Sequence, residues 1–229
     1  MSDEEVKAIE AVAEATGKAI EASRDLGGFI ARFIGGPLEQ AAGIVEDKLK
    51  YLRWERQMRL IQRANDFLTA NGMSEPTRQI PMNIAIPLLQ GASLEEDDQL
   101  QDRWAKLLVN AGDKESGINV PRIFVSIMDN LDPLSAEVME KIYSVPDEDA
   151  TEGIWTRDLP EKAIIKPRDE EDMSVSIELE IALTNLAMHR LVSPALFWGG
   201  TTGITCVHKT PLGKAFLQAC TLRSEREAA

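Results

Sequence analysis

The stretch that decides the fold is LEQAAGIVEDKLKYLRWERQMRLIQRANDF, residues 38–67. It contains no proline and one glycine, and good helix formers make up most of it. Pro37 precedes it, at a position where proline suits the first helical turn, and Asn71-Gly72 is a typical helix stop. The pattern predicts one helix from Pro37 to about Thr69, about 50 Å long at ~1.5 Å per residue.

Apolar residues recur along this stretch at helical spacing and predict two neighbouring stripes. A helix with two apolar stripes is usually covered on two sides, so we expect it to form the spine of a helical bundle. The first stripe comprises Tyr51, Trp54, Met58, Ile61 and Leu68, and the second comprises Leu49, Leu52, Leu60 and Phe67.

The same stretch is the basic part of an acidic protein. The whole chain has a net charge of −13 and a pI near 4.7. One interpretation is a solvated helix face with pairs four residues apart, such as Glu55 with Arg59. The other is a docking strip for the acidic remainder of the chain, for a partner or for an anionic surface. The basic residues are Lys48, Lys50, Arg53, Arg56, Arg59 and Arg63, of which Lys48, Arg53, Arg56 and Arg59 are candidate interaction residues.

Composition places the chain among ordinary globular proteins. It has 229 residues, 44% hydrophobic and 28% charged, which is enough to bury a real core. The acidic balance argues against nonspecific nucleic-acid binding. Cys206 and Cys220 give no disulfide framework or metal spacing, and His189 and His208 leave little room for a histidine site. We therefore expect no cofactor, no metal and no evident small-molecule substrate.

Cellular location follows from two further features. The first residues, MSDEEVKAIEAV, are acidic and unlike a signal peptide. No apolar run approaches the ~20 residues that a transmembrane helix needs. We expect a cytoplasmic protein, peripheral at the inner membrane if residues 25–36 touch lipid.

Residues 25–36, DLGGFIARFIGG, differ in kind from their neighbours. Gly27, Ala31 and Gly35 stand four apart, a row of small residues that permits close helix contact. Phe29 and Phe33 lie among the apolar residues that fill the remaining surface. Three interpretations stay open: a tight hairpin against the spine, contact with a membrane interface, and self-association.

Further helices are expected on both sides of the spine. Pro76, Pro81 and Pro87 limit the segment after it to short helical turns. Ser93 and Glu96 form a capping box that opens the next helix. Four consecutive acids there, residues 95–98, are best explained as first-turn carboxylates rather than metal ligands. The expected helices cover residues 3–24, 94–112, 120–131, 135–145, 155–165 and 177–191, and residues 166–173 are expected to be a disordered loop.

The C-terminal part resembles a winged-helix module. Phe197-Trp198 and residues 204–207 are predicted strands around a glycine turn, and a helix beginning at Thr210 follows. Many such modules place their third helix in the DNA major groove. Here that helix carries Glu178 and Glu180 against Arg190, and acidic residues repel phosphate. The resemblance implies the fold, used for protein interaction or structure.

The middle of the chain resembles the abortive infection alpha (Abi-alpha) family. The resemblance rests on three blocks in the family's order, AAGIVEDKLKYLRWERQMRL (41–60), LEEDDQLQDRWAKLLVNA (94–111) and LDPLSAEVMEKI (131–142). It implies a bacterial, mostly helical protein of antiviral defence, with no established active site. The positions that match are read as fold-defining or interaction residues: Asp47, Lys48, Leu49, Arg53, Glu96, Leu100, Trp104, Leu107 and Leu108.

The sequence therefore predicts a mainly α protein, a helical bundle around one long helix followed by a winged-helix-like α+β domain with a small β-hairpin. The expected divisions are an N-terminal part (1–36), a helical domain (37–131), a winged-helix-like domain (132–222) and a disordered tail (223–229). The expected function is non-enzymatic anti-phage defence through a protein partner or self-association, with membrane contact open. The alternative is a winged-helix DNA-binding regulator. The infection trigger, the cellular target and the oligomeric state do not follow from the sequence.

Overall fold

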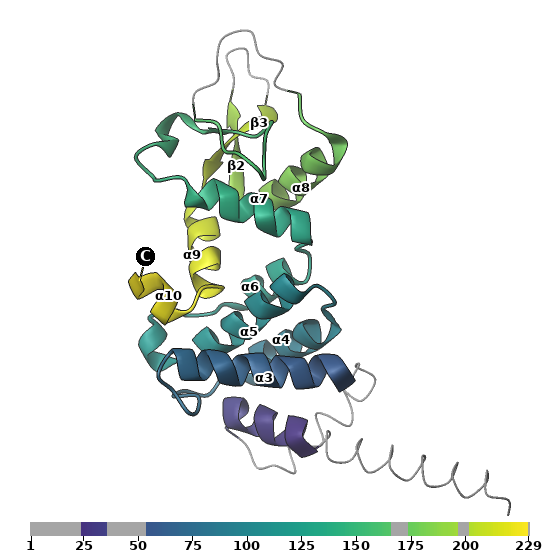
Figure 1. Ribbon diagram of the computed structural model, residues 1–229, viewed down its shortest axis with the longest axis vertical. Helices are drawn as coiled ribbons and strands as arrows, with labels where there is room; N and C mark the ends of the chain where they lie inside the picture. Colours follow the sequence, from purple (N-terminus) through teal and green to yellow (C-terminus); the bar gives the residue numbers. More distant parts are fainter. Residues whose placement is uncertain (1–23, 36–53, 166–173, 197–201, 229) are drawn as a thin grey trace, which may run out of the picture. The chain divides into compact units, whose positions relative to one another are not determined.

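The computed structural model describes residues 24–35, 54–165, 174–196 and 202–228 (Figure 1). This part of the chain is mainly helical with one small antiparallel sheet, which confirms the predicted fold class. The chain divides into two compact units, Met1–Arg122 with Leu222–Ala229, and Ile123–Thr221. The division comes earlier than the expected boundary at 131/132, and the last residues belong to the first unit.

The first unit is built around α3 (Trp54–Ala70), which confirms the second half of the predicted long helix. The expected first half, residues 37–53, lies outside the described residues. The buried face of α3 is a single row, Gln57, Leu60, Ala64 and Leu68. Met58, Ile61 and Phe67 lie half-buried beside this row, so the described apolar residues form one stripe with margins rather than two separate stripes.

Helices α4 (Met82–Leu94) and α5 (Asp98–Gly112) complete the layer beside α3, followed by the short 3-10 helix η2 (Lys114–Ser116) (Figure 1). The expectation of short turns before α5 was wrong, since α4 runs for 13 residues and contains Pro87. The predicted capping box was also wrong. Ser93 lies inside α4 and donates to the Leu89 carbonyl at 2.7 Å, while Asp97 caps α5 through the Gln99 and Leu100 amides.

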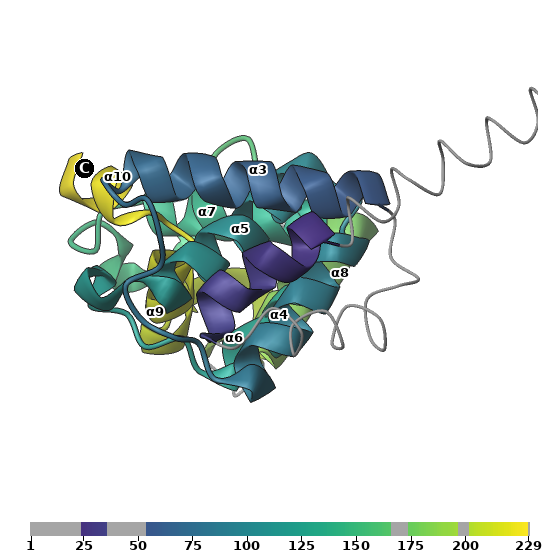
Figure 2. The same ribbon diagram turned by 90° about the horizontal axis from the view of Figure 1, so that it is seen from below.

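Residues 24–34 form a helix that packs on this layer (Figure 2). Arg32 donates to Asn65 Oδ1 of α3 at 2.8 Å, and the Ile80 amide donates to the Phe33 carbonyl at 2.8 Å. The expected helix at 3–24 lies outside the described residues up to residue 23. The expected disordered tail is instead the helix α10 (Arg223–Ala228).

The second unit carries α6 (Arg122–Met128, from Ile123 on), α7 (Pro133–Ser144), η3 (Ala150–Glu152), α8 (Ile177–Met188) and α9 (Pro211–Ala219). Its sheet has the order β1-β3-β2, with β1 (Ile154–Trp155), β2 (Val192–Leu196) and β3 (Thr202–Lys209). Phe124 and Phe216 pack edge to face in its core, with ring centroids 5.5 Å apart. The helix predicted to begin at Thr210 is confirmed as α9, and Thr210 caps it by accepting from the Gly213 amide.

Two predictions about this unit were wrong. A helix at 155–165 does not form, because Trp155 pairs with Cys206 of β3 and its amide donates to the Ile164 carbonyl at 2.8 Å. Pro160, which lacks an amide hydrogen, stands in the middle of that window and disfavours a helix. The first hairpin strand also begins earlier than expected, at Val192, and continues through Pro194 at a register shift.

The winged-helix resemblance rests on an expected order of three helices followed by a hairpin. In the described part of this unit, α7 is followed by the short strand β1, then by α8 and the hairpin of β2 and β3. The middle helix, expected at residues 155–165, does not form. Residues 166–173 and the hairpin tip, residues 197–201, lie outside the described residues. The winged-helix assignment therefore stays a prediction.

Candidate interaction surfaces

The basic residues of α3 lie against acidic residues of α5. Arg56 approaches Asp98 at 3.4 Å, Arg59 forms an ion pair with the same carboxylate, and Arg63 pairs with Asp102. The Arg59 hydrogen bond lowers the pKa of Asp98. The described part of the basic strip is thus engaged by the acidic remainder of the chain. Lys48 and Arg53 lie outside the described residues.

The candidate residues of the 25–36 segment mostly face inward. Phe29 is 2% exposed and Phe33 is fully buried, with ring centroids 5.0 Å apart. Gly27 is buried, Ala31 is half-buried and Gly35 is exposed with a positive φ of 67°. Phe29 and Phe33 therefore belong to the contact between the 24–34 helix and the rest of its unit. Lipid contact through Phe29 would require that contact to open.

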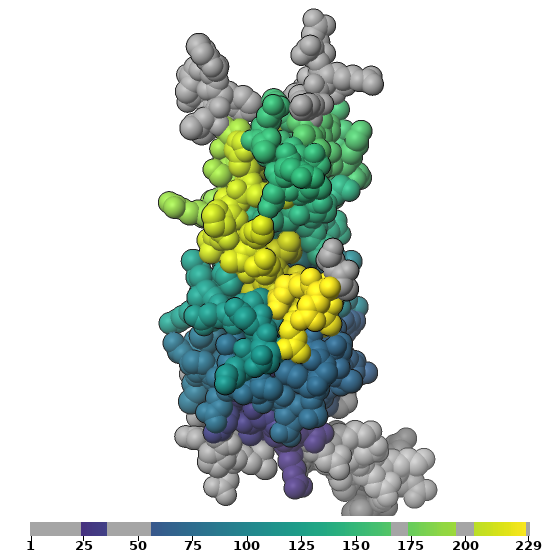
Figure 3. Space-filling model, turned by 90° about the vertical axis from the view of Figure 1, so that its left-hand side faces the viewer, coloured from purple at the N-terminus to yellow at the C-terminus, as the bar shows by residue number. Residues whose placement is uncertain are grey.

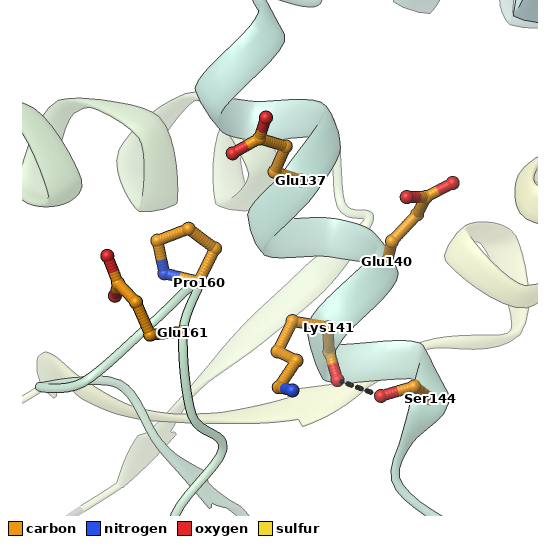
Figure 4. Close-up of a pocket in the computed structure, with 6 residues that line it drawn as sticks. All are labelled: Glu137, Glu140, Lys141, Ser144, Pro160 and Glu161. Atoms are coloured by element: carbon orange, nitrogen blue, oxygen red, sulfur yellow. Dashed lines mark hydrogen bonds between the residues drawn. The ribbon is translucent and has the colours of Figure 1, made fainter. Parts of the chain in front are cut away.

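Acidic side chains line a hollow of about 480 Å³ beside α7. Figure 4 shows Glu137 and Glu140 on the helix, pointing to different sides, and Glu161 beside Pro160 on the neighbouring segment. Ser144 there donates to the Lys141 carbonyl at 2.8 Å. Within the described ranges, no group of three or more His, Cys, Asp and Glu side chains is placed to hold a metal ion.

The cysteines offer no reactive thiol. Cys206 and Cys220 are both buried. Burial raises the pKa of the Cys206 thiol, which lowers its thiolate fraction and hence its reactivity. The Cys220 sulfur lies 4.0 Å from the Met128 sulfur in the core.

The exposed apolar face of α8 is the most unusual surface of the second unit. Ile177 is 68% exposed, Ile181 63% and Met188 78%. The buried side of α8 is instead formed by Leu179, Ala182, Leu183 and Leu186. Thr184 lies between the apolar residues, and together Ile177, Ile181, Thr184 and Met188 are called here the α8 face.

Hydrogen bonds fix the orientation of α8. Asn185 donates to the Asn130 carbonyl at 2.7 Å, and Ser176 caps the helix by accepting from the Leu179 amide. Asp132, the cap of α7, also lies near Asn185. Burial opposes the charge of Asp132, yet hydrogen bonds from Ser135 and Asn185 hold its pKa below the ordinary value. These polar contacts at the edge of the α8 face and at the start of the helix, with the buried leucines on the other side, fix which side of α8 faces outward.

Comparison with known proteins decides the family. The sequence profile described as abortive infection alpha matches residues 55–220, more than two thirds of the chain. The chain belongs to the abortive infection alpha family. Curated proteins and solved structures give no significant match. Among the described helices of this Abi-alpha protein, none combines the length and apolar character that a membrane crossing requires.

Of the Abi-alpha positions carried over from the sequence resemblance, the described apolar ones are core positions. Leu100, Trp104, Leu107 and Leu108 of α5 are at most 2% exposed, whereas Glu96, between α4 and α5, is exposed. The α8 face was missed because its residues are apolar and its spacing also fits a buried stripe. The sequence feature that could have revealed the exposed face is a second apolar row on the same helix, formed by Leu179, Leu183 and Leu186. Only one of two such rows can face the core.

Proposed function

We propose that this Abi-alpha protein acts in abortive infection without catalysis, by binding a protein through the α8 face. The observation that carries the proposal is the exposure of Ile177, Ile181 and Met188 on one side of one helix. Three of the six large apolar side chains that are exposed among the described residues lie there. Contiguous apolar exposure of this kind is typical of interaction sites, whereas single exposed apolar residues are ordinary.

Charge supports a protein partner over DNA at this helix. In the winged-helix interpretation, α8 would be the helix that enters the major groove. Its first turn carries Glu178 and Glu180, and its exposed row is apolar. DNA-binding helices present Arg, Lys, Asn or Gln to phosphates and base edges. The regulator hypothesis is therefore the weaker candidate, and a gel-shift with the upstream DNA of the gene at low salt tests it.

A pair of matched substitutions tests the proposal. Ile181→Glu places a charge on the α8 face, and Leu94→Glu places the same charge on α4 at a nearly equal exposure of 64%. Both variants should fold, since neither residue is buried. Phage plating on cells that carry the gene should show lost protection for Ile181→Glu and retained protection for Leu94→Glu. Full protection by Ile181→Glu at normal protein levels would refute the proposal.

A further inference from the structure

The path of the chain ties the second unit to the first at two points. The chain leaves the first unit after Arg122 and returns to it at Leu222, so the second unit is an insertion within the first. The returning link is short, because α9 ends at Ala219 and α10 begins at Arg223. Relative motion is the default for a unit on one flexible connection. A unit held at both ends has that freedom only when one of the two links opens.

Polar contacts attach most of the returning link to the first unit. Leu222 is buried, whereas none of residues 223–227 is. Arg223 donates to the Asn71 carbonyl at 2.9 Å, and the Ser224 amide donates to Asn71 Oδ1 at 3.2 Å. Burial of apolar surface, the main driving force of folding, therefore acts at Leu222 and contributes little along α10.

Two further contacts extend this attachment along α10. Arg226 donates to the Ser116 carbonyl at 3.0 Å, and Lys106 of α5 pairs with Glu225 at 2.8 Å. Burial lowers the pKa of Arg226, which means that docking of α10 removes part of the water from a charged group. The favourable contacts of α10 are thus partly offset by the cost of desolvation.

The docked position of α10 also leaves polar atoms beside it unsatisfied. Among the described residues, Asn71 Nδ2 and Asp113 Oδ2 are buried and have no hydrogen-bond partner. The Arg223 guanidinium lies 3.7 Å from Asp113 Oδ2, which is longer than a hydrogen bond. Because a buried polar group without a partner is unfavourable, the docked position of α10 is favoured by a small margin.

We infer that residues 222–228 form a latch, which opens by withdrawing from the first unit while both units stay folded. Opening leaves the second unit joined to the first only at Arg122–Ile123, where it is free to turn. Elements that open in this way are drawn from the least stable parts of a fold. A hinge needs only a few residues at the end of an element, such as the start of α6. The latch uses no residue of the α8 face and is therefore independent of the proposed function.

Two spin labels within the first unit measure whether the latch opens. Glu227→Cys labels α10 at a side chain that is 72% exposed, and Gln62→Cys labels α3 at another exposed position. Cys206 and Cys220 are buried and should stay unlabelled. Pulsed distance measurements on the full chain should give one narrow distance for the closed latch, with a minor broad component for the open latch.

Asp113→Asn should weaken the latch. It removes the charge that attracts the two arginines of α10 but keeps Oδ1, which accepts from the Glu115 amide at 2.8 Å. We expect the ratio of open to closed latch to rise about tenfold, as for the loss of one charged contact. Asp149→Asn is the matched control and should leave the ratio unchanged, because this exposed residue of the second unit makes no capping hydrogen bond.

Salt tests the latch without changing its charged residues. Raising the sodium chloride concentration from about 0.05 M to about 1 M shortens the Debye length to ~3 Å and should increase the open component. Circular dichroism should show unchanged helix content, which distinguishes opening from unfolding. A distance that stays single and narrow at high salt, and also in Asp113→Asn where that variant is folded, overturns the latch.

A second pair of labels measures whether the latch governs the second unit. Gln62→Cys is combined with Glu137→Cys, an exposed position on α7. The distribution of distances between these two labels should broaden in Asp113→Asn in step with the open component of the first pair, and Asp149→Asn should leave it unchanged. A distribution that stays the same while the latch opens, or that broadens while the latch stays closed, overturns the inference.

Discussion

Tyr143 shows how one hydroxyl joins three segments of the second unit. It donates to the Leu191 carbonyl at 2.7 Å and accepts from the Thr210 amide at 3.0 Å. Gly213 makes room for this arrangement, because a Cβ at that position would overlap both the Tyr143 hydroxyl and the Leu191 carbonyl. The Tyr143 hydroxyl, in the space left by Gly213, thus holds together the end of α7, the start of β2 and the cap of α9.

Removing either part should destabilise the protein. Tyr143→Phe leaves the Thr210 amide without its partner, and Gly213→Ala forces the hydroxyl or the backbone to move. We expect each to lower the free energy of unfolding by about 1–3 kcal/mol, measured by urea denaturation. Gly28→Ala is the control: no atom lies within 4 Å of its added Cβ, and it should be neutral or stabilising. A Gly213→Ala protein as stable as wild type would contradict this packing.

Asp147 is held by two lysines. It accepts from Lys214 at 2.8 Å and from Lys209 at 2.9 Å, and these bonds lower its pKa from 3.8 to about 2. A carboxyl whose pKa is depressed by folding contributes stability that is present above its unfolded pKa. That contribution is lost as the pH falls through the folded value.

The pH dependence of an Asp147→Asn variant follows. It should melt at a lower temperature than wild type at pH 7, and the difference should shrink as the pH falls below 3.8 toward about 2. Thermal melts over this range measure the difference, and added salt should reduce it because the group is exposed. Glu148→Gln is the control, since its side chain makes no ion pair with described residues. If the difference in melting temperature between wild type and Asp147→Asn stays constant from pH 7 down to about 2, the lysine pairing is contradicted.

At the scale of the element, α3 and α5 are joined by charge as well as by their apolar faces. The pairs of Arg56 and Arg59 with Asp98, and of Arg63 with Asp102, are all partly exposed. Isolated surface pairs of this kind contribute little, but several together define which face of α3 meets α5.

A charge swap isolates this element contact. Arg59→Glu sets two like charges together and should lower the melting temperature, more strongly at low salt than at high salt. Adding Asp98→Arg should restore most of the loss, since the pair is then reversed. Thermal melts at two salt concentrations are the measurement. An unchanged melting temperature in Arg59→Glu would show that this pair does not hold the helices.

How far the sequence predicts the fold differs from element to element. Helical spacing and an N-cap predict α9 correctly, because Thr210, Pro211 and the apolar residues agree. The boundary of α4 and α5 is missed because Ser93 and Asp97 both suit a cap, and tertiary packing of α4 decides between them. The outward side of α8 does not follow from the sequence, because the helix has apolar residues on both sides, with Leu183 facing inward and Ile181 outward. Periodicity alone does not say which side meets the sheet.

The candidate site follows the same rule. Arg59 is predicted as an interaction residue from its charge, and its engagement by Asp98 required the three-dimensional arrangement. Phe29 and Phe33 are predicted to interact from their apolar spacing, which is equally the spacing of a buried helix face. The spacing of residues along a helix identifies its faces, but only the folded structure shows which face is buried and which is on the surface.

At the scale of the whole molecule, the chain returns to its first unit at the end. Figure 3 shows α10, in bright yellow, against earlier residues of that unit. Arg223 donates to the Asn71 carbonyl at 2.9 Å, and Lys106 pairs with Glu225 at 2.8 Å. The Arg223 guanidinium also lies 3.7 Å from Asp113, whose carboxylate is completely buried. The final helix therefore supplies a positive charge to a buried negative one.

Removing residues 223–229, which were expected to be disordered, should accordingly destabilise the first unit. The Asp113 carboxylate would lose the Arg223 guanidinium, and a buried charge deprived of its partner costs about 3–5 kcal/mol when desolvation is complete. Here the free energy of unfolding should fall by less, about 1–3 kcal/mol, because the Glu115 amide still donates to Asp113 at 2.8 Å. Urea denaturation of the truncated chain, of Arg223→Met and of Glu227→Gln separates the contributions: the first two should be destabilised and the third, an exposed carboxylate at 72%, should not. A truncated chain as stable as wild type would mean that Asp113 does not depend on the C-terminal helix.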